Sequence, residues 1–171
     1  MRENGQVTPE PAREPVTHGG PAYLRPPNLA LVFAGGTAGV LAREALVIVL
    51  PDIEGLPIAV LVANVAGALL LGVLLTALAA GEETSARRTL RLLFGTGLLG
   101  GFTTYSALAQ AVALLTIDGS AGLAIAYGLG TVVLGGLATW LGIALGAVLG
   151  RRVSSRDPAT GCGAGEGDRD A

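Results

Sequence analysis

Four long apolar segments, separated by short polar connections, dominate the chain. They cover about residues 29–50, 57–80, 89–117 and 121–150. Each is long enough to cross a hydrocarbon core of about 30 Å at about 1.5 Å of rise per residue. The pattern therefore predicts an all-α integral membrane protein whose four transmembrane helices form one compact domain over residues 29–150.

The third apolar segment contains a run that disfavours a continuous helix. From Gly100 to Ser106 the sequence reads Gly-Gly-Phe-Thr-Thr-Tyr-Ser, and neither glycine nor threonine is a good helix former. We expect the third helix to be broken here, near the middle of the membrane. Because lipid cannot satisfy the backbone N–H and C=O groups that a break releases, breaks are tolerated where they face protein, a cavity or an ion. The run therefore predicts an ion site near the bilayer centre.

Both ends of the chain differ in composition from the apolar segments. Residues 1–28 and 151–171 are rich in proline, glycine and charge and contain no apolar core. We expect them to be disordered tails, and the first is not a secretory signal peptide. The lone His18 and Cys162 fall in these tails, which excludes an intrachain disulfide and argues against a zinc-type site. With 51% apolar residues, the composition is typical of a polytopic protein surrounded by membrane lipid, not of a nucleic-acid-binding domain.

The placement of arginine predicts the orientation of the helices. With four spans, the N-terminus, the connection at residues 81–88 and the C-terminus share one side of the membrane. Every arginine except Arg43 belongs to that side, whereas the opposite connections carry Asp52, Glu54 and Asp118. The positive-inside rule therefore predicts that both termini lie in the cytoplasm and that the protein spans the cell membrane.

Glycines recur at four-residue spacing within the spans. Small residues at this spacing let helices approach closely in lipid, so we interpret most of them as packing positions. One group, Gly95-x-Gly97-x-x-Gly100, matches the dinucleotide-binding fingerprint, but it lies in a membrane segment instead of a strand–turn–helix unit, and we treat the match as accidental. The spaced glycines are Gly35/Gly39, Gly97/Gly101 and Gly142/Gly146/Gly150.

The polar residues inside the spans each allow two interpretations. Arg43 is either paired or snorkelling to an interface, or it faces a water-filled interior. Asn64 either joins two helices or offers N–H donors to an anion. Thr103, Thr104 and Ser106 either bond to their own helix or line a polar path. Their position directly after two glycines favours the path.

Three motifs follow one another on the first three spans. They are Gly35-Gly36-x-x-Gly39-x-x-x-Arg43, then Asn64-x-x-Gly67, then Gly97-x-x-Gly100-Gly101-Phe102-Thr103-Thr104-Tyr105-Ser106. In type, order and location they resemble those of the Fluc/CrcB fluoride channel family, and the similarity covers about residues 30–150. The resemblance implies a fluoride-selective passive channel, not an enzyme, that exports fluoride and lowers its toxicity as an antiparallel dimer.

The resemblance also implies two kinds of ion site. The backbone carbonyls of Gly100 and Thr103, contributed by both subunits, would hold a structural Na⁺ at the dimer centre. Fluoride would be met by neutral donors and by the electropositive ring edge of Tyr105, with Arg43 attracting anions near the vestibule. The pore residues implied in full are Asn64, Tyr105, Ser106, Thr104, Tyr127, Thr131 and Arg43.

Several positions depart from the family pattern. Leu108 stands where the family has a second pore phenylalanine, Ala107 where it has a threonine, and Glu44 where it has a tyrosine. A homodimer of antiparallel copies requires insertion in both orientations, which the strong arginine bias disfavours. The partner is therefore either a second copy or, as we favour, a homologous chain of opposite orientation. The alternatives are a small proton-coupled multidrug exporter that uses Glu44, or a non-conducting assembly subunit.

Overall fold

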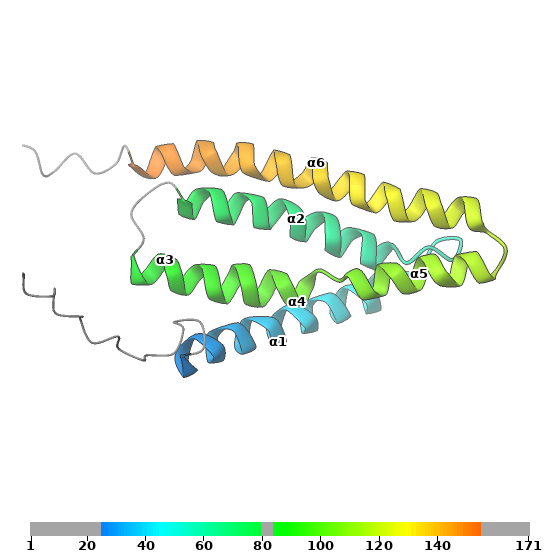
Figure 1. Ribbon diagram of the computed structural model, residues 1–171, viewed down its shortest axis with the longest axis horizontal. Helices are drawn as coiled ribbons and strands as arrows, with labels where there is room; N and C mark the ends of the chain where they lie inside the picture. The colour runs from blue at the N-terminus through cyan, green and yellow to red at the C-terminus, as the bar shows by residue number, and fades with distance from the viewer. Residues whose placement is uncertain (1–24, 80–83, 155–171) are drawn as a thin grey trace, which may run out of the picture.

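The computed structural model describes residues 25–79 and 84–154, so most of the two predicted tails lies outside the described residues. Within these ranges the chain is helical apart from one isolated β-bridge between Ile53 and Leu56. The elements, labelled in Figure 1, are α1 (Pro26–Val49), α2 (Ile58–Ala79), α3 (Ser85–Leu90), the π-helix η2 (Arg91–Leu99), α4 (Gly100–Phe102), α5 (Tyr105–Ile117) and α6 (Ala121–Ser154).

Four stretches of the described chain are long and apolar enough to cross a membrane. They are Pro26–Val49, Ile58–Ala79, Ser85–Ile117 and Ala121–Gly150. The third stretch consists of α3, η2, α4 and α5, with an interruption before α5. The predicted all-α protein with four transmembrane helices and a broken third helix is confirmed.

Proline sets the boundaries of the first two helices. α1 begins at Pro26, earlier than predicted, because proline fits the first turn of a helix, where its missing N–H costs nothing. It ends at Val49, since Leu50 precedes Pro51 and is extended. Pro57 then directly precedes α2.

The helices lie side by side with alternating directions (Figure 1). α2 packs along α6, and α1 packs along η2 and α4. α1 and the third span run in the same direction, whereas α2 and α6 run in the opposite one. We call the end with Arg25, Arg87 and Arg88 the arginine end, and the end with the connections at residues 50–57 and 118–120 the acidic end.

Glycine allows the close approach of α1 to the third span. A Cβ atom at Gly35 would meet the carbonyl oxygen of Leu93, and one at Gly39 would meet that of Leu98. In return, a Cβ atom at Gly101 would meet the carbonyl oxygen of Gly36. The hydrophobic effect cannot drive helices together in lipid, so close backbone packing of this kind holds them together instead.

A second glycine contact joins α2 to α6. A Cβ atom at Gly142 would meet the carbonyl oxygen of Leu69, and one at Gly146 would lie 2.7 Å from that of Val73. The prediction that these glycines serve helix packing is confirmed. The bundle is thus two glycine-packed helix pairs, α1 with the third span and α2 with α6.

Candidate ion site at the broken helix

The third helix breaks at Thr103 and Thr104. Both residues are extended, with φ/ψ of −79°/152° and −148°/121°. The glycine pair that predicted the break remains helical within α4, because Gly101 is held against the backbone of Gly36. The break is therefore confirmed, but it lies after the glycines, at residues whose β-branched side chains suit an extended backbone.

Asn64 pairs with the backbone at this break. Its Nδ2 atom donates to the carbonyl oxygen of Thr104 at 3.0 Å, and its Oδ1 atom accepts from the N–H of Thr104 at 2.8 Å. These two bonds fix the orientation of the side-chain amide. If the amide were flipped, its N–H would face the N–H of Thr104 and its oxygen would face the carbonyl oxygen of Thr104. A primary amide has two N–H groups, and the reciprocal pair with Thr104 uses one of them. Asn64 thus joins α2 to the break and keeps a second N–H.

The break also redirects two backbone donors. In a continuous α-helix the N–H of Thr104 would donate to the carbonyl of Gly100, and the N–H of Ala107 to that of Thr103. Here the first donates to Asn64 Oδ1 and the second to Thr104 Oγ1, at 3.2 Å. The carbonyls of Gly100 and Thr103 therefore lose their regular helical donors, and oxygens of this kind suit an alkali cation.

A metal site of the usual acidic or His/Cys type is not found in the described part of the chain. There, no group of three or more His, Cys, Asp or Glu side chains is placed to hold a metal. Gly100 is exposed, and nothing lies within 4 Å of the position that a Cβ atom would occupy there. By donor type and by the open space at Gly100, these two carbonyls suit an alkali cation such as Na⁺.

The hydroxyl groups at the break have different partners. Thr103 Oγ1 donates to the carbonyl of Leu99 at 2.9 Å, so this hydroxyl bonds to its own helix. Thr104 Oγ1 caps α5 by accepting from Ala107 and lies 3.1 Å from Ser106 Oγ. The side-chain oxygens of Thr104 and Ser106 therefore form a hydrogen-bonded pair at the start of α5.

A cavity of about 280 Å³ opens at the break. It brings together several predicted site residues from α2, α5 and α6. Leu108, where the family has an aromatic residue, is one of its walls. The residues that line it are Asn64, Thr103, Thr104, Tyr105, Leu108, Thr131, Val132 and Gly135. Val132 and Gly135 were not predicted; Gly135, one turn beyond Thr131, could have been found from the helical spacing.

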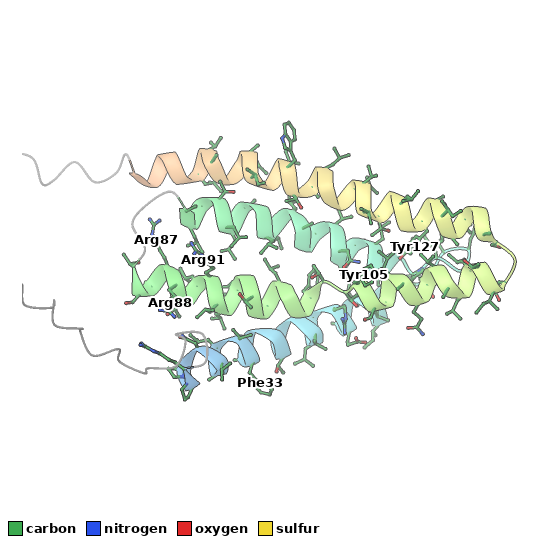
Figure 2. The ribbon with its side chains drawn as sticks, in the orientation of Figure 1. Phe33, Arg87, Arg88, Arg91, Tyr105 and Tyr127 are labelled. Carbon is green, nitrogen blue, oxygen red and sulfur yellow. The ribbon has the colours of Figure 1, made fainter. Side chains whose placement is uncertain are left out.

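Tyr105 and Tyr127 differ in their position along the bundle and in their burial (Figure 2). Tyr105 stands at the break and is 82% exposed, so its ring has few neighbours within the chain. Tyr127 is buried nearer the acidic end, and its hydroxyl donates to the carbonyl of Pro57 at 3.0 Å. Thr131, one turn further along α6, is buried and donates to the carbonyl of Tyr127 at 2.7 Å. Tyr127 thus ties α6 to the start of α2, whereas Thr131 reaches the cavity.

Arg43 lies on α1 and is paired with the adjacent Glu44. Its Nη2 and Nε atoms donate to Glu44 Oε1 at 3.1 and 3.3 Å. Of the interpretations that the sequence allowed for Arg43, the structure shows the paired one. Neither residue is among those that line the cavity at the break.

Known proteins with similar sequences support one family. Residues 30–143 match the family described as CrcB-like protein, Camphor Resistance (CrcB). A fluoride-specific ion channel FluC 2 of Leifsonia xyli is 42% identical over 133 residues, which are 77% of this chain and 92% of that protein. A fluoride-specific ion channel FluC of Deinococcus radiodurans is 41% identical over 118 residues, which are 67% and 91% of the two chains. The chain therefore belongs to the CrcB family.

Proposed function

We propose that the protein is a subunit of a fluoride-selective passive channel that lets fluoride leave the cytoplasm down its own gradient. The relatives named as fluoride-specific ion channels support the substrate. The observation that carries the proposal is the reciprocal pair of Asn64 and Thr104, which holds the helix break open beside a cavity and leaves one amide N–H to donate.

Neutral donors suit the chemistry of fluoride. The ion is small and tightly hydrated, so a pore has to offer close donors in place of lost water. A fixed cation at the narrowest point would bind the anion too firmly for conduction, which requires release. The second N–H of Asn64, the hydroxyl pair of Thr104 and Ser106 and the ring edge of Tyr105 provide donors without net charge.

The proposed assembly is an antiparallel dimer with a central Na⁺. One chain supplies two carbonyls, those of Gly100 and Thr103, and a second chain would supply two more. When bound, the ion would neutralise four partial negative charges at the dimer centre and hold the two breaks together. Tyr105 and Gly100 are exposed in the single chain, which supports an assembly in which a second subunit covers this side of the ion site.

The partner that fits best is a homologous chain of opposite orientation. Arg87, Arg88 and Arg91 gather at the same end of the bundle (Figure 2), which favours a single orientation with both termini in the cytoplasm of the cell. Leu108 supplies no aromatic edge to the cavity of this chain. A partner with aromatic residues at the positions of both Tyr105 and Leu108 would line a second pore, and that pore would conduct fluoride better than the one lined by this chain.

The rival functions have less support. A proton-coupled exporter would need the carboxylate of Glu44 to bind a proton and the substrate in turn, whereas this carboxylate accepts hydrogen bonds from Arg43. An assembly subunit without a pore would have no use for an amide held beside a cavity at a helix break. The absence of a nucleophile paired with a base in the motifs supports transport over catalysis.

Growth in fluoride tests the proposal in living cells. Expression in a bacterium that lacks its own fluoride exporter, alone or with a homologous chain, should restore growth in fluoride medium. Asn64→Ala and Tyr105→Ala should reduce this rescue at equal expression, most strongly where this chain is expressed alone. Gln110→Ala, which removes an exposed amide from α5 away from the break, is the matched control and should rescue fully. Equal rescue by all three variants would contradict a pore at the break.

A further inference from the structure

The ion pair on α1 has no part in the site described so far. Arg43 and Glu44 are adjacent in sequence, and the guanidinium group contacts the carboxylate through two nitrogen atoms, at 3.1 and 3.3 Å. The arginine side chain is 22% exposed and the glutamate side chain 56% exposed. The two charges are thus in contact on the first span, and the carboxylate is the more exposed of the two.

The packing of α1 brings this pair level with the broken helix. α1 and the third span run in the same direction, and Gly36 contacts Gly101. Three residues later, a Cβ atom at Gly39 would lie 2.8 Å from the backbone nitrogen of Phe102. Arg43 follows Gly39 by one helical turn, so it lies at the level of the residues directly after Phe102. These residues form the break.

The nearby carboxylate of Glu44 therefore offsets much of the electrostatic potential that Arg43 would create at the level of the helix break. A lone guanidinium at this level would raise the local concentration of anions. A carboxylate in contact with it turns the charge into a dipole, whose field falls off faster with distance. Pairing also lowers the cost of keeping an arginine inside a membrane span, where isolated charges are expensive.

We propose that Glu44 is a charge-balancing residue: it holds Arg43 as a neutral pair and thereby limits how strongly the channel draws fluoride toward the break. This inference rests on the proposed channel function. An unpaired Arg43 would raise the local fluoride concentration, which speeds efflux at low fluoride, where entry limits the rate, and slows it at high fluoride, where release limits the rate. Glu44 acts through Arg43 and not by touching fluoride.

The test is fluoride efflux from liposomes, in whichever assembly conducts, at low fluoride concentration. Glu44→Gln exposes the arginine charge and should speed efflux about twofold at low ionic strength, the effect of one unit charge acting across about 10 Å of a water-like medium. Arg43→Gln should slow efflux, because it leaves a carboxylate alone beside the anion path. The double variant restores neutrality and should return near the wild-type rate.

Controls separate this electrostatic effect from a change in packing. The gain in Glu44→Gln should disappear in strong salt, since the Debye length falls from about 10 Å at 0.1 M to about 3 Å at 1 M. Glu44→Asp keeps the charge and should match wild type. Glu54→Gln removes a carboxylate from the connection before α2 and should change efflux far less than Glu44→Gln.

Two results distinguish the failures. A conducting wild type whose Glu44→Gln variant behaves like Glu54→Gln, or gains a salt-independent rate, overturns the charge-balancing role and leaves the channel intact. A wild type that conducts no fluoride, alone or with a homologous chain, overturns the proposed function and this inference with it. Size-exclusion profiles of each variant identify any that fail to fold. If Glu44→Gln is among them, the comparison of Arg43→Gln with the double variant decides, because the proposal predicts slower efflux in the first and a near wild-type rate in the second.

Discussion

At the scale of single residues, Asn64 combines two roles that its side chain can fill at once. Its oxygen and one N–H bond to the backbone of Thr104, and the other N–H remains for a ligand. The sequence allowed either helix joining or anion donation. It could not combine them, because the partner of a buried amide depends on which helix packs against it.

The structural role of Asn64 predicts a loss of stability on truncation. Asn64→Ala leaves the N–H and C=O of Thr104 without their partner, and each buried unsatisfied group costs about 1–3 kcal/mol. We expect a clearly lower midpoint of thermal unfolding in detergent. Size-exclusion chromatography of heated samples measures this midpoint. Gln110→Ala should unfold at the wild-type temperature. An unchanged midpoint for Asn64→Ala would mean that the pair adds nothing to the stability of the fold.

Tyr127 is expected to act on stability and not on ion selection. The resemblance places Tyr127 among the pore residues, but its hydroxyl group donates to the carbonyl of Pro57. Tyr127→Phe removes that bond and should destabilise the fold by about 1 kcal/mol, while the ratio of fluoride to chloride efflux stays the same. A changed ratio at unchanged stability would return this hydroxyl to the fluoride path.

At the scale of elements, the close contact of α1 with the third span depends on the absence of side chains. Gly39→Ala would place a methyl group against the backbone of Leu98, which cannot move aside as a side chain would. Overpacking of this kind typically costs about 1–3 kcal/mol. We expect reduced yield and a lower unfolding midpoint. Gly136→Ala is the matched control, because nothing lies within 4 Å of that position.

The spans were predictable from the sequence, and the inner structure of the third span was only partly so. Length and apolar composition suffice for four helices, since lipid admits few alternatives. The break falls at Thr103 and Thr104 instead of at the glycine pair, and a π-helix precedes it. The position of the break depends on a contact with α1: Gly101 packs against the backbone of Gly36 and stays helical, and helix propensity takes no account of such a neighbour.

At the scale of the whole molecule, the arginine end predicts a single orientation in the membrane. The chain has one cysteine, Cys162, which follows the last span and reports the side on which the C-terminus lies. A membrane-impermeant maleimide should label it in inverted vesicles and leave it unlabelled in intact cells. Labelling from both sides would indicate dual orientation and would remove the main argument for a homologous partner.

The family of this chain could be predicted from its sequence, whereas its partner depends on the surface of a second chain. Motifs on three spans indicated the family, and the family was confirmed by its relatives. The ring of Tyr105 is exposed and the backbone at Gly100 is open, and in the proposed assembly both would contact a second chain. The arginine bias and the departure at Leu108 favour a homologous chain as the partner.

Fluoride efflux from liposomes, with chloride as the control, tests the central claim most directly. The purified chain is reconstituted alone and together with a homologous chain of opposite orientation. The proposed function predicts rapid fluoride-only efflux in at least one of these preparations, and the heterodimer predicts it in the second and not in the first. Silence in both, or efflux of chloride as fast as fluoride, would contradict the account.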